Sequence, residues 1–275
     1  MNKIAAFCLL GIVLTSAKTG YHKNPLKIKD TVRITDSFTM KGTEVTLEEW
    51  MDFIVNHDFD SGLFPDSSKI SAPAAALLDD LKKGSNFKYF DIIKTYSVEN
   101  TFWGLLRVRF KKVYSLDESR NPDFFSPRIP VTGISFAQAQ AFCRWREEMI
   151  NTESRVPLHI ALPTIEMYRQ TIPNRDSVNP KGCYMYNVLD CHCEVNSKES
   201  LKQTTGKYLQ SAVWFWPDDN GLYNLQGNAA EMTSTEGIAM GGSFRQYARQ
   251  TFRDSQQLYD GPQDWLGFRY VVTLK

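Results

Sequence analysis

The chemistry open to this sequence depends first on its cysteines. Five are present, and one of them lies inside an apolar run at the start of the chain. Cys183, Cys191 and Cys193 lie close together, with His192 between the last two, whereas Cys143 stands apart. Structural zinc sites use such ligands, but this spacing matches no known finger and adjacent ligands strain tetrahedral geometry. A disulfide from Cys183 to Cys191 or Cys193 is the favoured interpretation, and zinc is the alternative.

Other reactive patterns are missing from the sequence. It has no H-E-x-x-H helix, G-x-S-x-G elbow, P-loop or dinucleotide-binding glycine pattern. The aromatic run Trp214, Phe215 and Trp216 is either a recognition surface or part of the core, and core packing is favoured. Four arginines near the C-terminus either grip an acidic peptide or hold long loops by hydrogen bonds. These arginines are Arg245, Arg249, Arg253 and Arg269.

The elements that must position these residues begin with two helices. Thr46 with Glu49, and Ser135 with Gln138, have the spacing of capping boxes at helix starts. The second helix is predicted to reach Ile150. Its apolar face is predicted to contain Phe136, Ala139, Cys143 and Ile150, flanked by Phe142, Trp145 and Met149. Cys143 is therefore expected to be a small buried side chain.

The rest of the chain is less regular. A strand is predicted at residues 37–40, a helix at 74–81 that ends at Gly84, a strand at 102–113 and a short helix at 162–168. The last hundred residues are rich in glycine, asparagine, aspartate and aromatic residues, which is typical of short strands between long turns. Helices followed by such a region predict an α+β fold with little regular secondary structure.

The N-terminus has the pattern of an export signal. Lys3 precedes an apolar stretch at residues 4–14, and small residues before Lys18 offer a cleavage site. We expect residues 1–17 to be a signal peptide and residues 18–33, which are polar and basic, to be a tether. One domain would then occupy residues 34–275. An uncleaved anchor is the alternative interpretation of residues 1–17.

Charge and hydropathy exclude two classes of partner. The chain has 32 basic and 31 acidic residues, and removing Lys3 with the signal leaves 31 of each. A neutral chain has no bulk field for nucleic acid or an acidic membrane. No stretch after residue 17 is apolar and long enough to be a transmembrane segment. In an oxidising, exported setting the disulfide interpretation is reasonable.

Several segments, in order, resemble the formylglycine-generating enzyme (sulfatase-modifying factor) family. The segments are residues 44–53, 130–145, 155–166, 221–233, 241–244 and 267–269. Together they span about residue 34 to the C-terminus. The resemblance implies a variant of the C-type lectin fold. Ala230, Met232 and residues 237–240 resemble the family's non-catalytic members from bacterial cell envelopes, some of them parts of gliding and secretion machinery.

The resemblance also implies that the enzyme's chemistry is lost. Family enzymes oxidise a substrate cysteine with two copper-binding cysteines that follow the Gly-Gly-Ser motif, and thiolates suit Cu(I). The equivalent positions here are Gln246 and Thr251, and no cysteine follows Cys193. No copper is therefore expected.

Calcium is a separate expectation from the resemblance. The family's calcium loop uses an asparagine, backbone carbonyls and a glutamate, which correspond here to Asn224, Gly227, Ala229 and Glu231. The alternative is a tight turn in which Glu231 pairs with an arginine such as Arg269. A second family site would use Asn187, the Val188 carbonyl and an acid near Thr204. No acid stands there, so only the first loop is predicted to hold structural calcium.

Together these features predict an exported, non-catalytic protein, in the periplasm or elsewhere in the cell envelope, that binds envelope protein partners. The alternative function is a metal-dependent oxidase of the formylglycine-generating type with a non-standard site. A lectin-like ligand-binding protein is the third hypothesis, but the Glu-Pro-Asn and Trp-Asn-Asp sugar motifs are absent.

Overall fold

Helices and two small sheets make up the described part of the chain. The structure is a computed structural model, and it describes residues 30–84, 128–172, 184, 186–190 and 207–275. The predicted strand at 102–113 lies outside these residues. None of the helices within them is both long and apolar enough to cross a membrane.

Both predicted capping boxes are confirmed. Helix α1 (Leu47–Asn56) begins after Thr46, whose hydroxyl accepts a hydrogen bond from the Glu49 N–H, while the Glu49 carboxylate accepts one from the Thr46 N–H. Helix α5 (Phe136–Glu153) begins in the same way, with Ser135 and Gln138. Because each box is made within four residues, it could be read directly from the sequence.

The buried face of α5 agrees with the prediction. Ala139, Phe142 and Cys143 are buried, whereas the flanking Met149 is 45% exposed. At 100° per residue, Met149 lies about 80° around the helix from Ala139, at the edge of the buried face. The two other helices are α2 (Ala72–Gly84) and α6 (Ile165–Thr171), which begins after the N-cap Thr164.

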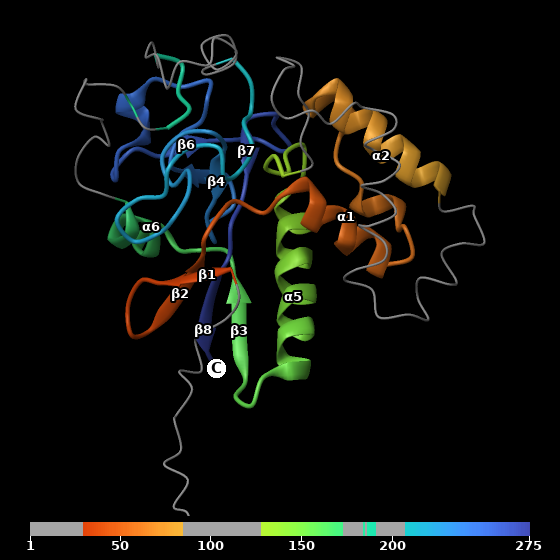
Figure 1. Cartoon of the computed structure of the whole chain (residues 1–275), viewed down its shortest axis with the longest axis horizontal. Helices are drawn as coiled ribbons and strands as arrows, with labels where there is room; N and C mark the ends of the chain where they lie inside the picture. Colours follow the sequence, from red (N-terminus) through yellow and green to blue (C-terminus); the bar gives the residue numbers. More distant parts are fainter. Residues whose placement is uncertain (1–29, 85–127, 173–183, 185, 191–206) are drawn as a thin grey trace, which may run out of the picture.

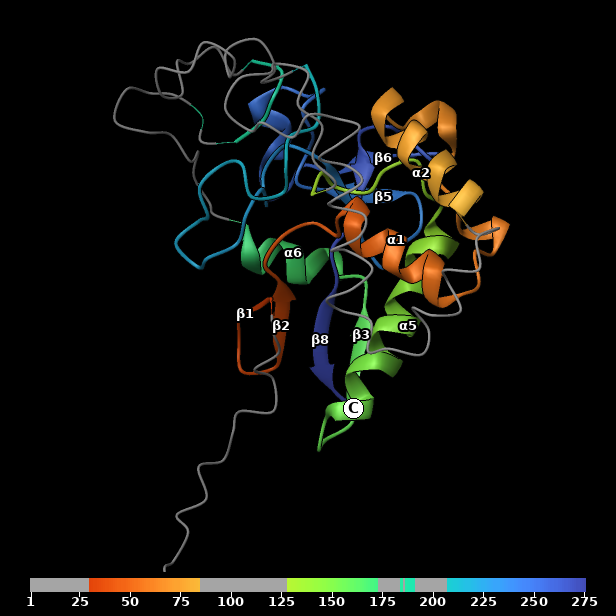
Figure 2. The ribbon, with the colours of Figure 1, turned by 45° about the vertical axis from the view of Figure 1, so that its right-hand side comes forward.

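The first sheet is antiparallel and has the order β1 (Thr31–Arg33), β2 (Phe38–Lys41), β8 (Val271–Leu274) and β3 (Leu158–Ala161). Strand β1 falls within the expected tether, so the folded part starts before residue 34. Helix α5 lies alongside β3 in both views (Figures 1 and 2).

Side chains of α5 cover the outer edge of β3. The Asn151 amide accepts a hydrogen bond from the Leu158 N–H and donates one to the Leu158 carbonyl, both at 2.9 Å. The Glu147 carboxylate accepts a hydrogen bond of 2.8 Å from the Ile160 N–H. Backbone groups that an edge strand would leave open to another chain are thus satisfied by the protein's own helix.

The second sheet is made of very short strands. Its order is β6 (Gln257–Leu258), β5 (Ile238–Met240), β4 (Ala230–Met232) and β7 (Leu266–Gly267). Only the β4–β7 pair is parallel. Three 3₁₀ turns, η1 (Ser61–Leu63), η2 (Ser67–Lys69) and η3 (Ala248–Thr251), complete the described elements. This is the α+β arrangement with little regular structure that the sequence predicts.

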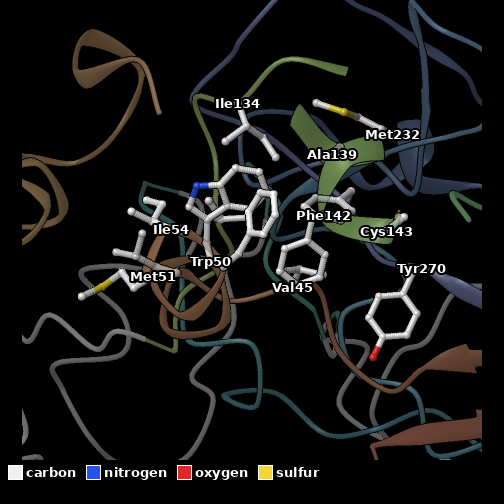
Figure 3. Close-up of a cluster of buried hydrophobic side chains, with 14 of the residues drawn as sticks. Val45, Trp50, Met51, Ile54, Ile134, Ala139, Phe142, Cys143, Met232 and Tyr270 are labelled. Atoms are coloured by element: carbon white, nitrogen blue, oxygen red, sulfur yellow. The ribbon is translucent and has the colours of Figure 1, made fainter. Parts of the chain in front are cut away.

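An aromatic cluster between α1, α5 and the second sheet forms the main core (Figure 3). The Trp50 ring stacks on Phe142 at 5.6 Å between centroids and meets Phe53 and Phe268 edge-on. These rings fix the segment between β2 and α1, where the Val45 N–H donates to the Phe268 carbonyl. That segment carries Glu44 into the polar centre described next.

Candidate functional site

A buried polar centre lies where the two sheets meet. Arg269 follows β7 and precedes β8, and its side chain is fully buried. Its guanidinium donates to both carboxylate oxygens of Glu231, on β4, at 2.6 Å each. It also donates to the Lys41 carbonyl of β2 at 3.2 Å and to the Tyr223 carbonyl at 2.8 Å. Arg269 therefore links elements of both sheets.

Glu44 is the second carboxyl of this centre and is also fully buried. Its Oε1 accepts a hydrogen bond of 2.8 Å from the Asn228 side-chain amide, and its Oε2 accepts one of 3.2 Å from that of Asn224. Burial raises the pKa of Glu44 to about 7, against the lowering effect of the nearby Arg269 guanidinium. Burial alone would lower the pKa of Arg269, but the Glu231 carboxylate holds it above its ordinary value.

Asn228 connects this centre to the neighbouring loops. Its side-chain oxygen accepts hydrogen bonds from the Asn187 amide and the Gln210 N–H, and its backbone carbonyl accepts one from the Phe244 N–H. Asn224 and Asn228 both have left-handed backbone conformations, with φ of 48° and 60°. Asparagine tolerates this region better than most residues, so these two positions allow the loop to turn its side chains inward.

The predicted calcium residues are thus brought to one place, but the acid among them is already engaged. Both oxygens of Glu231 bind Arg269, which is the pairing that the sequence left as the alternative. The Asn224 Oδ1 is buried with no hydrogen-bond partner among the described residues. A calcium ion at Glu231 would therefore have to displace Arg269 or share the carboxylate with it. Calcium binding by this loop is untested, and the ion pair between Glu231 and Arg269 opposes it.

The family's second calcium site, which the sequence does not predict here, cannot be assembled from the described residues. The side-chain amide of Asn187 is buried and donates to the Tyr208 carbonyl as well as to Asn228. Thr204 lies outside the described residues.

The two positions that correspond to the enzyme's cysteines lie on the segment around η3. Thr251 is fully buried, and its hydroxyl donates to the Ala248 carbonyl at 2.7 Å and accepts from the Gln226 amide at 3.3 Å. Gln246 is half-buried, and its Oε1 has no partner among the described residues. Neither side chain supplies a thiolate, which is the species that exchanges with a substrate thiol.

Cys143 does not replace the missing pair. It is buried in α5, and burial raises the pKa of its thiol. Its role as a small core side chain is confirmed. Cys183, Cys191 and Cys193 lie outside the described residues, so the disulfide stays a prediction.

Three of the four arginines bind polar groups within the protein. Arg245 pairs with Asp264, Arg253 donates to the Ile172 carbonyl, and Arg269 binds Glu231. The guanidinium of Arg249 lies over the Tyr247 ring at 5.5 Å from its centroid. The interpretation as loop-holding arginines is therefore confirmed for Arg253 and Arg269, whereas the ion pair of Arg245 is exposed.

The aromatic run is divided between core and surface. Phe215 is 4% exposed, in agreement with the favoured core interpretation. Trp214 and Trp216 are 41% and 46% exposed, and Val213 beside them is 46% exposed. Core packing is therefore wrong for the two tryptophans, because the chain turns here, with the Trp214 N–H donating to the Ser211 carbonyl, and only Phe215 is directed into the protein.

The irregular α+β fold agrees with that of a formylglycine-generating-enzyme-type domain. The model of the sulfatase-modifying factor enzyme 1-like domain matches residues 12–274, so the chain belongs to this family. A search of curated protein sequences gives no match.

Solved structures give more distant likenesses. CarF is 14% identical with a TM-score of 0.48, covering 86% of this chain and 87% of its own. PvdO from Pseudomonas aeruginosa is 11% identical with a TM-score of 0.41, covering 61% and 76%. The Treponema denticola variable protein 1 is 13% identical with a TM-score of 0.41, covering 58% and 77%. The family assignment comes from the matched domain rather than from these structures.

Sequence reasoning gave Glu44 and Asn228 no role. Both lie in segments that resemble the family, but they bind each other across 184 positions of the chain. No local pattern joins two residues so far apart, so the available signal was their position in segments that resemble the family.

Proposed function

We propose that this protein is an exported, non-catalytic member of its family that acts as a structural or binding component of the cell envelope. The apolar N-terminal segment supports export, and the residues at the former catalytic positions support the absence of formylglycine chemistry. The resemblance of Ala230 and Met232 to envelope members of the family supports the envelope role.

The observation that carries the proposal is the environment of Thr251. Its side chain has no exposed surface, and both hydrogen-bonding functions of its hydroxyl are used within the protein. A Cβ added to Gly242 would lie 2.8 Å from the Thr251 Cγ2 and 3.0 Å from the Gln250 carbonyl oxygen, so the two segments are closely packed at this point. A thiol at this position would be inaccessible as well as buried.

An activity assay tests the catalytic half of the proposal. Purified protein with copper, oxygen and a Cys-x-Pro-x-Arg peptide is expected to give no aldehyde above background by mass spectrometry. The double variant Gln246→Cys, Thr251→Cys is the matched control. We expect its thiol at 246 to react with a thiol reagent far faster than that at 251, because burial raises a thiol pKa. Aldehyde formation by the parent protein would overturn the proposal.

A partner experiment tests the binding half. Trp214 and Trp216 offer large exposed aromatic surfaces, a residue type that contributes strongly at protein interfaces. Tagged parent protein and the variant Trp214→Ser, Trp216→Ser are purified from the native envelope. The parent is expected to retain assembly proteins that the variant loses. Leu258→Ser is the control, because Leu258 is 78% exposed on β6. Equal recovery with all three proteins would contradict binding through the tryptophans.

A further inference from the structure

The surroundings of the Arg269 guanidinium consist of oxygen atoms. Its hydrogen-bond partners are the two carboxylate oxygens of Glu231 and the carbonyl oxygens of Lys41 and Tyr223. These come from three separate parts of the chain, and Arg269 and Glu231 are both essentially inaccessible to solvent. Buried charge of this kind is tolerated only when it is paired and hydrogen-bonded.

An all-oxygen set of carboxylate and carbonyl groups is also the ligand set that calcium prefers. Two more oxygen-bearing side chains lie beside it. The Asn224 Oδ1, one residue after Tyr223, is buried without a partner among the described residues. Glu44 is bound to the Asn224 amide and is near enough to Arg269 for the guanidinium to lower its pKa.

The oxygens of Glu231, Lys41 and Tyr223 around the guanidinium form an oxygen cage. A calcium ion does not fit this cage while Arg269 occupies it. The ion would have to share the Glu231 carboxylate with a guanidinium already at 2.6 Å from both oxygens. Two cations on one buried carboxylate would repel each other strongly, because little solvent screens them. The cage therefore binds one cation at a time.

We propose that Arg269 is the resident cation of this cage, holding the loop from Asn224 to Glu231 in the place of a calcium ion. Two consequences follow. The parent protein is insensitive to calcium and to chelators, and removal of the guanidinium uncovers a calcium-binding site. The inference does not depend on the proposed envelope function.

The parent protein tests the first consequence. It is exchanged into chelator, divided, and melted with and without millimolar calcium, and its bound calcium is measured by atomic emission. We expect the same melting temperature in both samples, since a ligand specific for the native state would raise it. We also expect bound calcium far below one equivalent per chain. A clear rise in melting temperature with calcium, or one calcium per chain, would overturn the proposal.

The variant Arg269→Ala tests the second consequence. In chelator its melting temperature is expected to fall by roughly 10 °C, because Glu231 is left as an unpaired buried charge. Calcium is expected to restore part of that loss. The double variant Arg269→Ala, Glu231→Gln is expected to lose the calcium response, since it lacks the main ligand. Arg245→Ala, which removes an exposed ion pair with Asp264, is the control and should melt near the parent temperature.

A folded Arg269→Ala protein that ignores calcium would show that the oxygens do not form a cation cage. If this variant is insoluble in chelator, recovery of soluble protein only in the presence of calcium supports the cage. Insolubility under both conditions leaves the decision to the parent measurement, which needs no variant.

Discussion

The buried carboxyl of Glu44 predicts that stability falls between acid and neutral pH. Burial raises its pKa to about 7 in the folded protein, whereas its ordinary value is 4.5. Between these two values the unfolded chain has released a proton that the folded chain retains. The folded state therefore binds more protons than the unfolded state, and its stability decreases as pH rises.

The size of the effect follows from the pKa difference. Each pKa unit corresponds to about 1.36 kcal/mol, so the interval from 4.5 to about 7 amounts to roughly 3 kcal/mol. This contribution is fully present below the unfolded pKa of 4.5 and is lost as pH rises through the folded pKa of about 7. Since a domain is stabilised by only about 5–15 kcal/mol in total, the change is measurable.

The assay compares urea unfolding of the parent and Glu44→Gln across this pH range. Glutamine has nearly the same shape and stays neutral. The unfolding free energy of the variant, relative to that of the parent, should therefore rise by roughly 3 kcal/mol from acid to neutral pH.

The variant Glu147→Gln is the control, and its pH dependence should have the opposite sign. Although burial raises the pKa of Glu147, donors from Lys275, Ile160 and His159 lower it overall. Its contribution is present above the unfolded pKa and is lost only as pH falls through the lowered folded pKa. A pH-independent difference for Glu44→Gln would refute the reasoning.

Three further results are expected. Asn151→Ala should cost about 2 kcal/mol in urea unfolding, because it leaves two backbone groups of β3 without partners, and an unchanged midpoint would contradict this. The intact mass of the exported protein should correspond to a start at Lys18, and a mass that retains residues 1–17 would indicate an anchor. Non-reducing peptide mapping should link Cys183 to Cys191 or Cys193, whereas three free thiols or stoichiometric zinc would contradict the disulfide.

The helices could be predicted because their signals are local. Each capping box joins a residue to one three positions later, and the sequence gives both partners. The strands could be predicted less well, since β1 and β6 have only three and two residues and are defined by partners far away in the chain. Residues 31–33 look like a polar tether until β2 is placed beside them.

The site could be predicted only in part, for a related reason. The resemblance located the loop from Asn224 to Glu231 and the replaced positions Gln246 and Thr251, but it could not choose between calcium and Arg269 as the partner of Glu231. That choice depends on which side chain reaches the carboxylate across 38 positions. The exposure of Trp214 and Trp216 could not be predicted from the sequence either, because protein cores and recognition surfaces use the same residue types.

Short strands change where the stability of this fold resides. A two- or three-residue strand contributes few ladder hydrogen bonds, so the two sheets need another junction. Arg269 supplies one, because it donates to the Lys41 carbonyl of the first sheet and to Glu231 of the second. Breaking a buried pair of this kind costs about 3–5 kcal/mol, against about 0.5 kcal/mol or less for most surface changes. Sensitivity to substitution should therefore concentrate at this junction, while substitutions at the exposed Trp214 and Trp216 should cost little stability.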